Sequence, residues 1–146
     1  MNKAERAKEL FEAGYNCAQS VFLAFAEDVM DLDTAARLAS GLGGGLAGMR
    51  NTCGAVSGMA MAYGLLRGYA DPRAKAEKQA VYESLRDLIL EFEQENGSSV
   101  CRTLLGLDAG VTYQAPSDRS GAYYQQRPCP RLCASAASIL ERHLQK

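Results

Sequence analysis

The sequence lacks the residues on which several common kinds of active site depend. Only one histidine, His143, occurs among the 146 residues. A metalloprotease pair and a facial triad each need two histidines, and a His-dependent cysteine protease needs a histidine with an orienting partner. Hydrolytic chemistry is therefore disfavoured, and the sequence leaves open whether the protein is an enzyme. His143 lies near the expected end of the last helix and is interpreted as structural.

The sequence also lacks an excess of charge of either sign and a long apolar run. Sixteen Lys and Arg residues stand against seventeen Asp and Glu, so the formal net charge is -1 and no global field attracts nucleic acid. The most apolar stretch, 53–66, is shorter than the roughly 20 residues that cross a bilayer. The charged residues 1–6 lack the apolar core of a secretory signal. We therefore expect a cytoplasmic protein without nucleic-acid binding or membrane insertion.

The two-residue alternation of apolar and polar residues that is typical of strands is missing as well. Helical periodicity recurs instead, which predicts an all-α fold with a single domain over 1–146. We expect a multi-helix bundle in which a Gly-rich loop, 41–48, precedes a buried central helix. The expected helices cover about 3–13, 16–29, 34–40, 53–69, 72–96, 98–105 and 129–144, and the segment 108–128 is expected to be irregular.

Capping residues give the expected helix starts. Asn16 is the expected N-cap of the second helix, which carries Val29 inward, and Asp33 is the expected cap of the third. The remaining starts are expected at Asn51 or Thr52, at Asp71-Pro72, at Ser98 or Ser99, and at Cys129-Pro130.

Five cysteines are the most informative residues of the chain. In a reducing compartment they are metal ligands or redox thiols more often than a disulfide framework. Four of them fall at expected helix starts, where free N–H groups favour a thiolate and lower the thiol pKa. If alternate helices run parallel, these starts meet at one end of the bundle. The four are Cys17, Cys53, Cys101 and Cys129, and Cys133 follows one turn after Cys129.

Other polar groups are weaker candidates for a role at such a site. The glycine run before a helix start offers a phosphate site, but it does not match a P-loop, and close helix packing is favoured. Arg50 either neutralises a thiolate or is a solvated surface residue. Tyrosines of the irregular segment either cover the cysteine end or pack on the body, and three glutamates indicate a solvated helix face. These residues are Tyr113, Tyr123 and Tyr124, and Glu91, Glu93 and Glu95.

Several motifs together resemble one known family, the redox-active proteins with a C…GCAxxG…C…C cysteine pattern. The likeness covers nearly the whole chain. Its motifs are Gly14-Tyr15-Asn16-Cys17-Ala18-Gln19, the glycine run, Cys53-Gly54-Ala55-Val56-Ser57-Gly58, Cys101 before Leu104-Leu105-Gly106, and Cys129-Pro130.

The resemblance implies that the four pattern cysteines are Cys17, Cys53, Cys101 and Cys129. Cys133 stands where the family usually has an apolar residue. The family is also distantly similar to part of the split-Soret cytochromes, which carry haem and an iron–sulfur centre. This chain contains no Cys-x-x-Cys-His, so covalent c-type haem is unsupported.

Three hypotheses for the cysteines follow. In the first, Cys17, Cys53, Cys101 and Cys129 ligate a [2Fe–2S] or [4Fe–4S] iron–sulfur cluster for electron transfer or redox sensing. In the second, low-pKa cysteines carry out thiol–disulfide exchange without metal, with Cys129 and Cys133 as nucleophile and resolving thiol. In the third, four cysteines hold a structural zinc ion. Cys133 is either a spare ligand of the site or the resolving thiol. The expected partner is a redox protein, and a homodimer stays an open alternative.

Overall fold

The computed structural model describes the backbone of residues 1–146 and the side chains of 1–123 and 127–146. Over this backbone the chain forms eight α-helices and one short 3-10 helix, and it contains no strand beyond a single bridged pair, Thr52 and Val100. The all-α prediction is confirmed. The elements are α1 (Lys3–Glu12), α2 (Cys17–Ala26), α3 (Leu32–Ala39), η1 (Ser40–Leu42), α4 (Gly54–Arg67), α5 (Lys75–Asn96), α6 (Cys101–Leu104), α7 (Gly121–Gln126) and α8 (Cys129–Leu144).

The start of α2 is fixed by a reciprocal cap. The Asn16 side chain accepts a hydrogen bond from the Gln19 backbone N–H, and the Gln19 side chain accepts one from the Asn16 N–H. The Asn16 amide also donates to the Ser40 carbonyl at 3.0 Å, which ties this helix start to η1. Because a cap satisfies N–H groups that the helix cannot, Cys17 is held as the first residue of α2.

Several other predicted caps were wrong. Asp31 rather than Asp33 caps α3, with its carboxylate accepting from the Thr34 N–H. The α4 helix begins after Cys53 itself. The α5 helix begins at Lys75, because the Asp71 carboxylate accepts from the Arg73 N–H two residues on and closes a turn first.

Two further boundaries differ from the sequence-based expectation. Val29 is 58% exposed rather than inward-facing, because α2 ends at Ala26 before reaching it. The sixth helix is a single turn that begins after Val100, since the Ser98 side chain accepts from the Val100 N–H instead of capping a helix. The segment expected to be irregular contains α7, which Ser120 caps.

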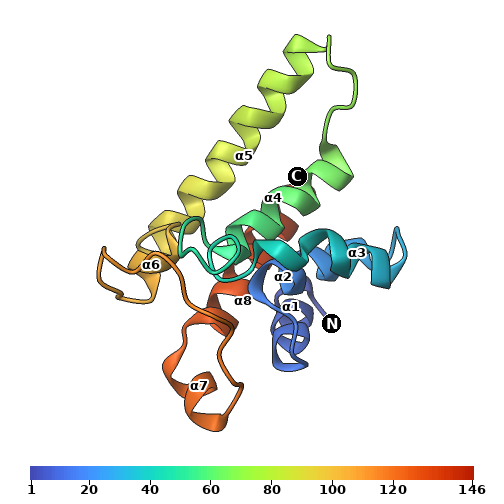
Figure 1. Cartoon of the computed structure of the whole chain (residues 1–146). Coiled ribbons are helices and arrows are strands. Elements are labelled where there is room, and N and C mark those ends of the chain that lie inside the picture. Colours follow the sequence, from blue (N-terminus) through green and yellow to red (C-terminus); the bar gives the residue numbers. More distant parts are fainter.

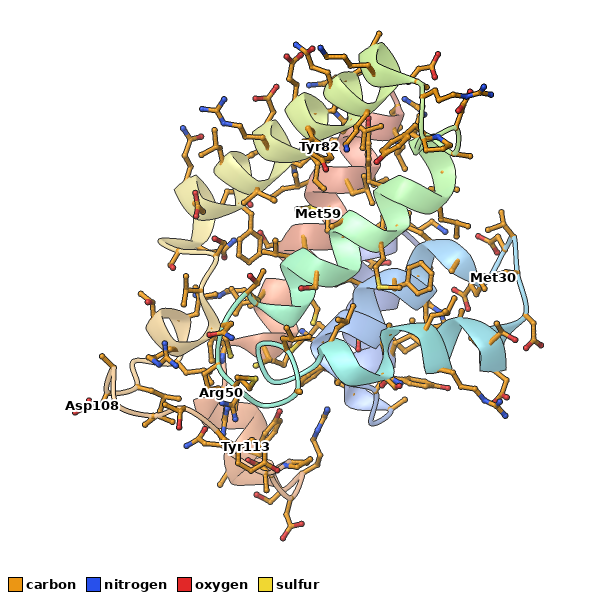
Figure 2. All side chains as sticks on the ribbon, turned by 45° about the horizontal axis from the view of Figure 1, so that its top comes forward. Met30, Arg50, Met59, Tyr82, Asp108 and Tyr113 are labelled. Atoms are coloured by element: carbon orange, nitrogen blue, oxygen red, sulfur yellow. The ribbon has the colours of Figure 1, made fainter. Side chains whose placement is uncertain are left out.

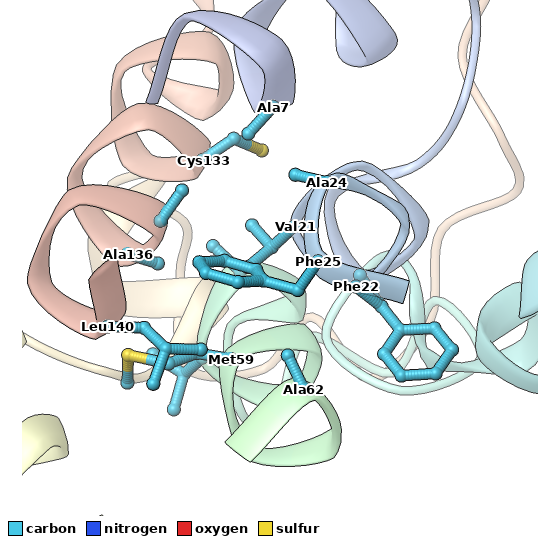
Figure 3. Packing of buried hydrophobic residues seen from close by; sticks show 14 of the residues in the cluster. Ala7, Val21, Phe22, Ala24, Phe25, Met59, Ala62, Cys133, Ala136 and Leu140 are labelled. Carbon is cyan, nitrogen blue, oxygen red and sulfur yellow. The ribbon is translucent and has the colours of Figure 1, made fainter. Parts of the chain in front are cut away.

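The helix α2 lies at the centre of the bundle. It contacts α1, α3, α4 and α8, and α1 packs along α8 (Figure 1). Eight of its ten residues are buried. Figure 3 shows Val21 and Phe25 of α2 beside Met59 of α4 and Leu140 of α8. The expected buried central helix, α4, packs against α2 and α8 and shares this core.

Only the first part of α4 is buried. Its last turn and the early turns of α5 are exposed, and the two helices form an arm that projects from the body (Figure 1). Of the expected apolar stripe of α5, Leu88 and Phe92 are buried in the core. Gly97 ends the helix in the left-handed conformation. None of the helices in the described structure is both long enough and apolar enough to cross a membrane.

Candidate functional site

The starts of four helices meet at one cavity of about 370 Å³. Cys53 is the N-cap residue of α4, and the other three lining cysteines are the first residues of α2, α6 and α8. The volume lies in the range of small-molecule and cofactor sites. The structure thus brings together all four residues singled out from the sequence, Cys17, Cys53, Cys101 and Cys129.

Backbone hydrogen bonds join the segment that contains Cys53 to the segment that contains Cys101. The Cys53 N–H donates to the Ser99 carbonyl at 2.8 Å, and the Cys101 N–H donates to the Asn51 carbonyl at 2.6 Å. These two bonds flank the antiparallel bridge between Thr52 and Val100. Cys101 therefore reaches the cavity through local strand-like pairing, and not through the parallel alternation of long helices that the sequence led us to expect.

Glycines let the backbone approach two of the sulfur-bearing residues. A Cβ added at Gly54 would lie 3.0 Å from the Cys17 Cβ. A Cβ added at Gly45 would lie 2.7 Å from the Cys101 Cβ and 2.6 Å from the Arg50 Cα, and Gly45 has φ +71°. Any side chain at Gly45 would therefore clash and adopt a strained backbone. The glycine run wraps the Cys101 side of the cavity.

Arg50 lines this cavity, and Figure 2 shows it near Tyr113, another lining residue. Arg50 is 7% exposed, and its Nη1 donates to the Cys101 Sγ at 3.5 Å. Its Nε donates to the Gln114 side-chain oxygen at 2.9 Å. Of the two alternatives that the sequence left open, the structure selects the one in which Arg50 faces a thiol.

Residues 108–128, here called the cover segment, close one side of the cavity. The Gln114 N–H donates to the Gly48 carbonyl at 2.9 Å, and the Arg119 guanidinium donates to the carbonyls of Phe11 and Tyr15. Tyr113 and Tyr123 line the cavity from this segment, as in the covering alternative, and Tyr123 also stacks on Phe11 of α1, as in the packing alternative. The Tyr124 side chain lies outside the described residues.

The expected lowering of the thiol pKa at helix starts was wrong for Cys17, Cys53 and Cys129. Burial raises the pKa of Cys53 to about 12, although the N–H groups of Ala55 and Val56 favour the thiolate. Charges on Cys101 and Cys129 raise it further. Removing a thiolate from water costs more than the two N–H groups return at this position.

Cys17 and Cys129 are coupled to each other. A hydrogen bond with Cys129 favours the Cys17 thiolate, but a hydrogen bond with Cys133, burial and neighbouring thiolate charge together raise the pKa of Cys17 well above its usual value. The hydrogen bond with Cys17, followed by burial, also raises the pKa of Cys129, against smaller effects of Arg127 and Arg50. The thiols therefore resist ionising together in the absence of a bound cation.

Metal-free, reduced protein is expected to lose stability above about pH 9. The Cys53 thiol has a pKa of 9.0 in the unfolded chain and about 12 in the folded one. The contribution of the buried thiol to the free energy of unfolding is therefore complete below pH 9 and is lost as the pH rises from 9 towards 12. Urea unfolding at about pH 8 and about pH 10.5 measures the loss. The variant Cys53→Ala should lose less over the same interval, and an equal loss in both proteins would contradict the assignment.

Cys133 belongs to the core behind the cavity. It is fully buried, it does not line the cavity, and Figure 3 shows it beside Ala7 and Ala24. Its Sγ donates to the Cys17 carbonyl at 3.8 Å, a weak contact with the first turn of α2. The position suits an apolar side chain, and a role for Cys133 as spare ligand or resolving thiol stays a prediction.

The structure does not test the assignment of these cysteines as ligands. Among the described side chains, no group of three or more His, Cys, Asp or Glu residues is placed to hold a single metal ion. All five cysteines are free thiols. Convergence at one cavity is a fact of the fold, and occupation by a cofactor stays a prediction.

Comparison with known families identifies the pattern. Residues 15–143 match the family described as "Putative redox-active protein (C_GCAxxG_C_C)". The chain belongs to this family. The match begins just before Cys17 and ends in α8, so every residue that lines the cavity of this redox-active family member, apart from Phe11, lies in the matched range. Neither a curated protein nor a solved structure matches the chain.

Sequence reasoning missed three residues of the site in this family member. Gln114 holds Arg50 across 64 positions of sequence, and Arg119 and Arg127 line the cavity from the cover segment. No periodicity or spacing pointed to them. Their positions follow from the docking of residues 108–128 against α1 and the glycine loop.

Proposed function

We propose that this protein binds an iron–sulfur cluster through Cys17, Cys53, Cys101 and Cys129 and works in electron transfer or redox sensing. The observation that carries the proposal is the arrival of four thiols, from the starts of four different helices, at one cavity. Four cysteine ligands are the usual set for both [2Fe–2S] and [4Fe–4S] clusters. A redox partner protein would exchange electrons with this site.

The chemistry of the cavity fits such a group. Its described lining includes three arginines and no carboxylate, so a cluster with negatively charged thiolate ligands would meet cations and no like charge. The raised pKa values of Cys17, Cys53 and Cys129 fit thiols that ionise only with a bound cation. When bound, the cluster would supply one-electron transfer, and hydrogen bonds and nearby charge would tune its potential.

Thiol–disulfide exchange is the second candidate, and the influence of both Cys129 and Cys133 on the ionisation of Cys17 favours it, because it places these thiols near one another. In that reaction two cysteines would form one disulfide, while a partner disulfide takes up the two electrons and two protons and becomes two thiols. The raised pKa values slow the attack, because the thiolate is the nucleophile. A structural zinc site is the remaining alternative for the same thiols.

Anaerobic isolation tests the proposal. We expect a brown protein with broad visible absorption that bleaches with dithionite, because charge transfer from thiolate to iron gives this colour. Metal analysis of the same sample should find iron together with acid-labile sulfide. A colourless protein that iron and sulfide cannot reconstitute would contradict the proposal, and one zinc ion per chain would support the zinc alternative.

A further inference from the structure

The cavity combines thiols with an excess of positive charge. Arg50, Arg119 and Arg127 all line it, and no Asp or Glu does among the residues that the structure describes. Arg119 donates hydrogen bonds to the backbone carbonyls of Phe11 and Tyr15. Arg127 donates to the Ser117 hydroxyl and lies over the Tyr123 ring. The cavity therefore has more fixed positive than negative charge on its walls.

Arg50 is the buried one of the three arginines. A buried guanidinium is costly unless an opposite charge pairs with it. The described contacts of Arg50 are the neutral Gln114 amide and the Cys101 sulfur, and none is a carboxylate. Gln114 fixes the orientation of the guanidinium, while Nη1 faces the thiol end of the cavity. The site is thus built to receive negative charge next to Cys101.

The loop that holds Arg50 has a left-handed backbone at three non-glycine positions. The φ of Arg50 is +60°, and such a conformation is adopted by a non-glycine residue only at a cost. Leu46 and Ala47 share it, with φ +67° and +51°, and their side chains are exposed. Arg50 is the one of the three whose side chain is buried.

We propose that the cysteine cavity is an anion-selective site, in which a small carboxylate or tetrahedral oxyanion binds beside Cys101 with its charge paired to Arg50. Arg127, from the cover segment, contributes a second cation to the same cavity. The inference goes beyond the proposed redox function, because anion binding is a property of the chain without a cofactor.

Alkylation of the reduced, metal-free full-length chain tests the charge preference. Anionic iodoacetate and neutral iodoacetamide are compared at Cys17 and Cys101 by peptide mass, and the ratio of their rates cancels the intrinsic reactivity of each thiol. Arg50→Gln should lower the iodoacetate-to-iodoacetamide ratio at Cys101 about tenfold, because a unit charge is removed at short range in a partly buried site. Arg50→Lys should retain most of the ratio.

Two further variants keep this test decisive. Arg102→Gln is the matched control, because Arg102 is a neighbouring arginine that binds the Val111 carbonyl and does not line the cavity. It should leave the ratio unchanged. Arg127→Gln should lower the ratio by a smaller factor than Arg50→Gln. It provides a second measurement of the charge effect if Arg50→Gln does not fold. Equal ratios in the wild type, Arg50→Gln and Arg127→Gln would overturn the proposal.

Protection by added anions identifies the class of ligand. Acetate and phosphate are each tested for slowing of iodoacetamide at Cys101, with chloride at the same ionic strength as control. Stronger protection by acetate indicates a carboxylate ligand, and stronger protection by phosphate indicates a tetrahedral oxyanion. Absence of protection by both would overturn the proposal. Because these measurements need no metal, their failure is distinct from a failure to find iron.

Discussion

Replacing Cys53 with Ser is expected to remove nearly all of the iron that the wild-type protein retains through purification, with loss of its visible absorption. Cys53 is the N-cap of α4, it lines the cavity, and its backbone is tied to the Cys101 segment. A serine hydroxyl ionises far less readily than a thiol, so a four-thiolate set would be left one ligand short. Iron and sulfide per chain, measured after anaerobic purification, give the result.

Cys133→Val is the matched control for this loss. Valine suits the buried position of Cys133 beside Ala7 and Ala24, and the four lining thiols remain, so metal content should not change. In the thiol-exchange alternative the same variant should trap a mixed disulfide on Cys129, because the resolving thiol is gone. Loss of iron in Cys133→Val, with retention in Cys17→Ser, would show that the four ligands are wrongly assigned.

Gly58→Ala is expected to destabilise the fold by about 1–3 kcal/mol, the usual range for overpacking a close contact. A Cβ at Gly58 would lie 2.5 Å from the Ala18 carbonyl oxygen and 3.1 Å from the Val21 Cβ, so α2 and α4 would have to separate. This separation would also shift Cys17 and Cys53, which start these two helices. Urea unfolding of the metal-free protein measures the change in stability. The iron content after reconstitution shows whether the cysteine site still binds metal.

Gly64→Ala provides the comparison on the same helix. A Cβ there meets nothing within 4 Å, so the gain in helix propensity should stabilise the protein by about 0.5–1 kcal/mol. Both variants replace one glycine with alanine, and the expected changes in the free energy of unfolding have opposite signs. If Gly58→Ala were as stable as Gly64→Ala, the close packing of α2 on α4 would not be a constraint on the site.

Local signals explain which parts of the fold were predictable. Asn16 with Gln19 three residues later specifies a helix start by short-range hydrogen bonds, and this boundary was confirmed. The Asp71-Pro72 start was wrong because the same kind of side-chain bond closes a turn there. Val29 was misplaced because a helix can end before its apolar pattern does.

The cysteine pKa values show a different limit. Position at a helix start predicts a stabilised thiolate, and the N–H groups of Ala55 and Val56 do favour that of Cys53. Burial depends on which helices cover the thiol, and sequence spacing does not contain this information. At Cys53 burial dominates, so the direction of the shift was wrong although the location was right.

The sequence by itself determined the all-α class, the family and the placement of four cysteines at helix starts, because periodicity, caps and cysteine motifs are written in short stretches of chain. Only the tertiary structure decided that these starts share one cavity, that Cys133 lies behind it, and that Arg50 faces Cys101 with Gln114 as its support. These features join segments far apart in sequence. They depend on how the helices pack and how the cover segment docks, which no local pattern specifies.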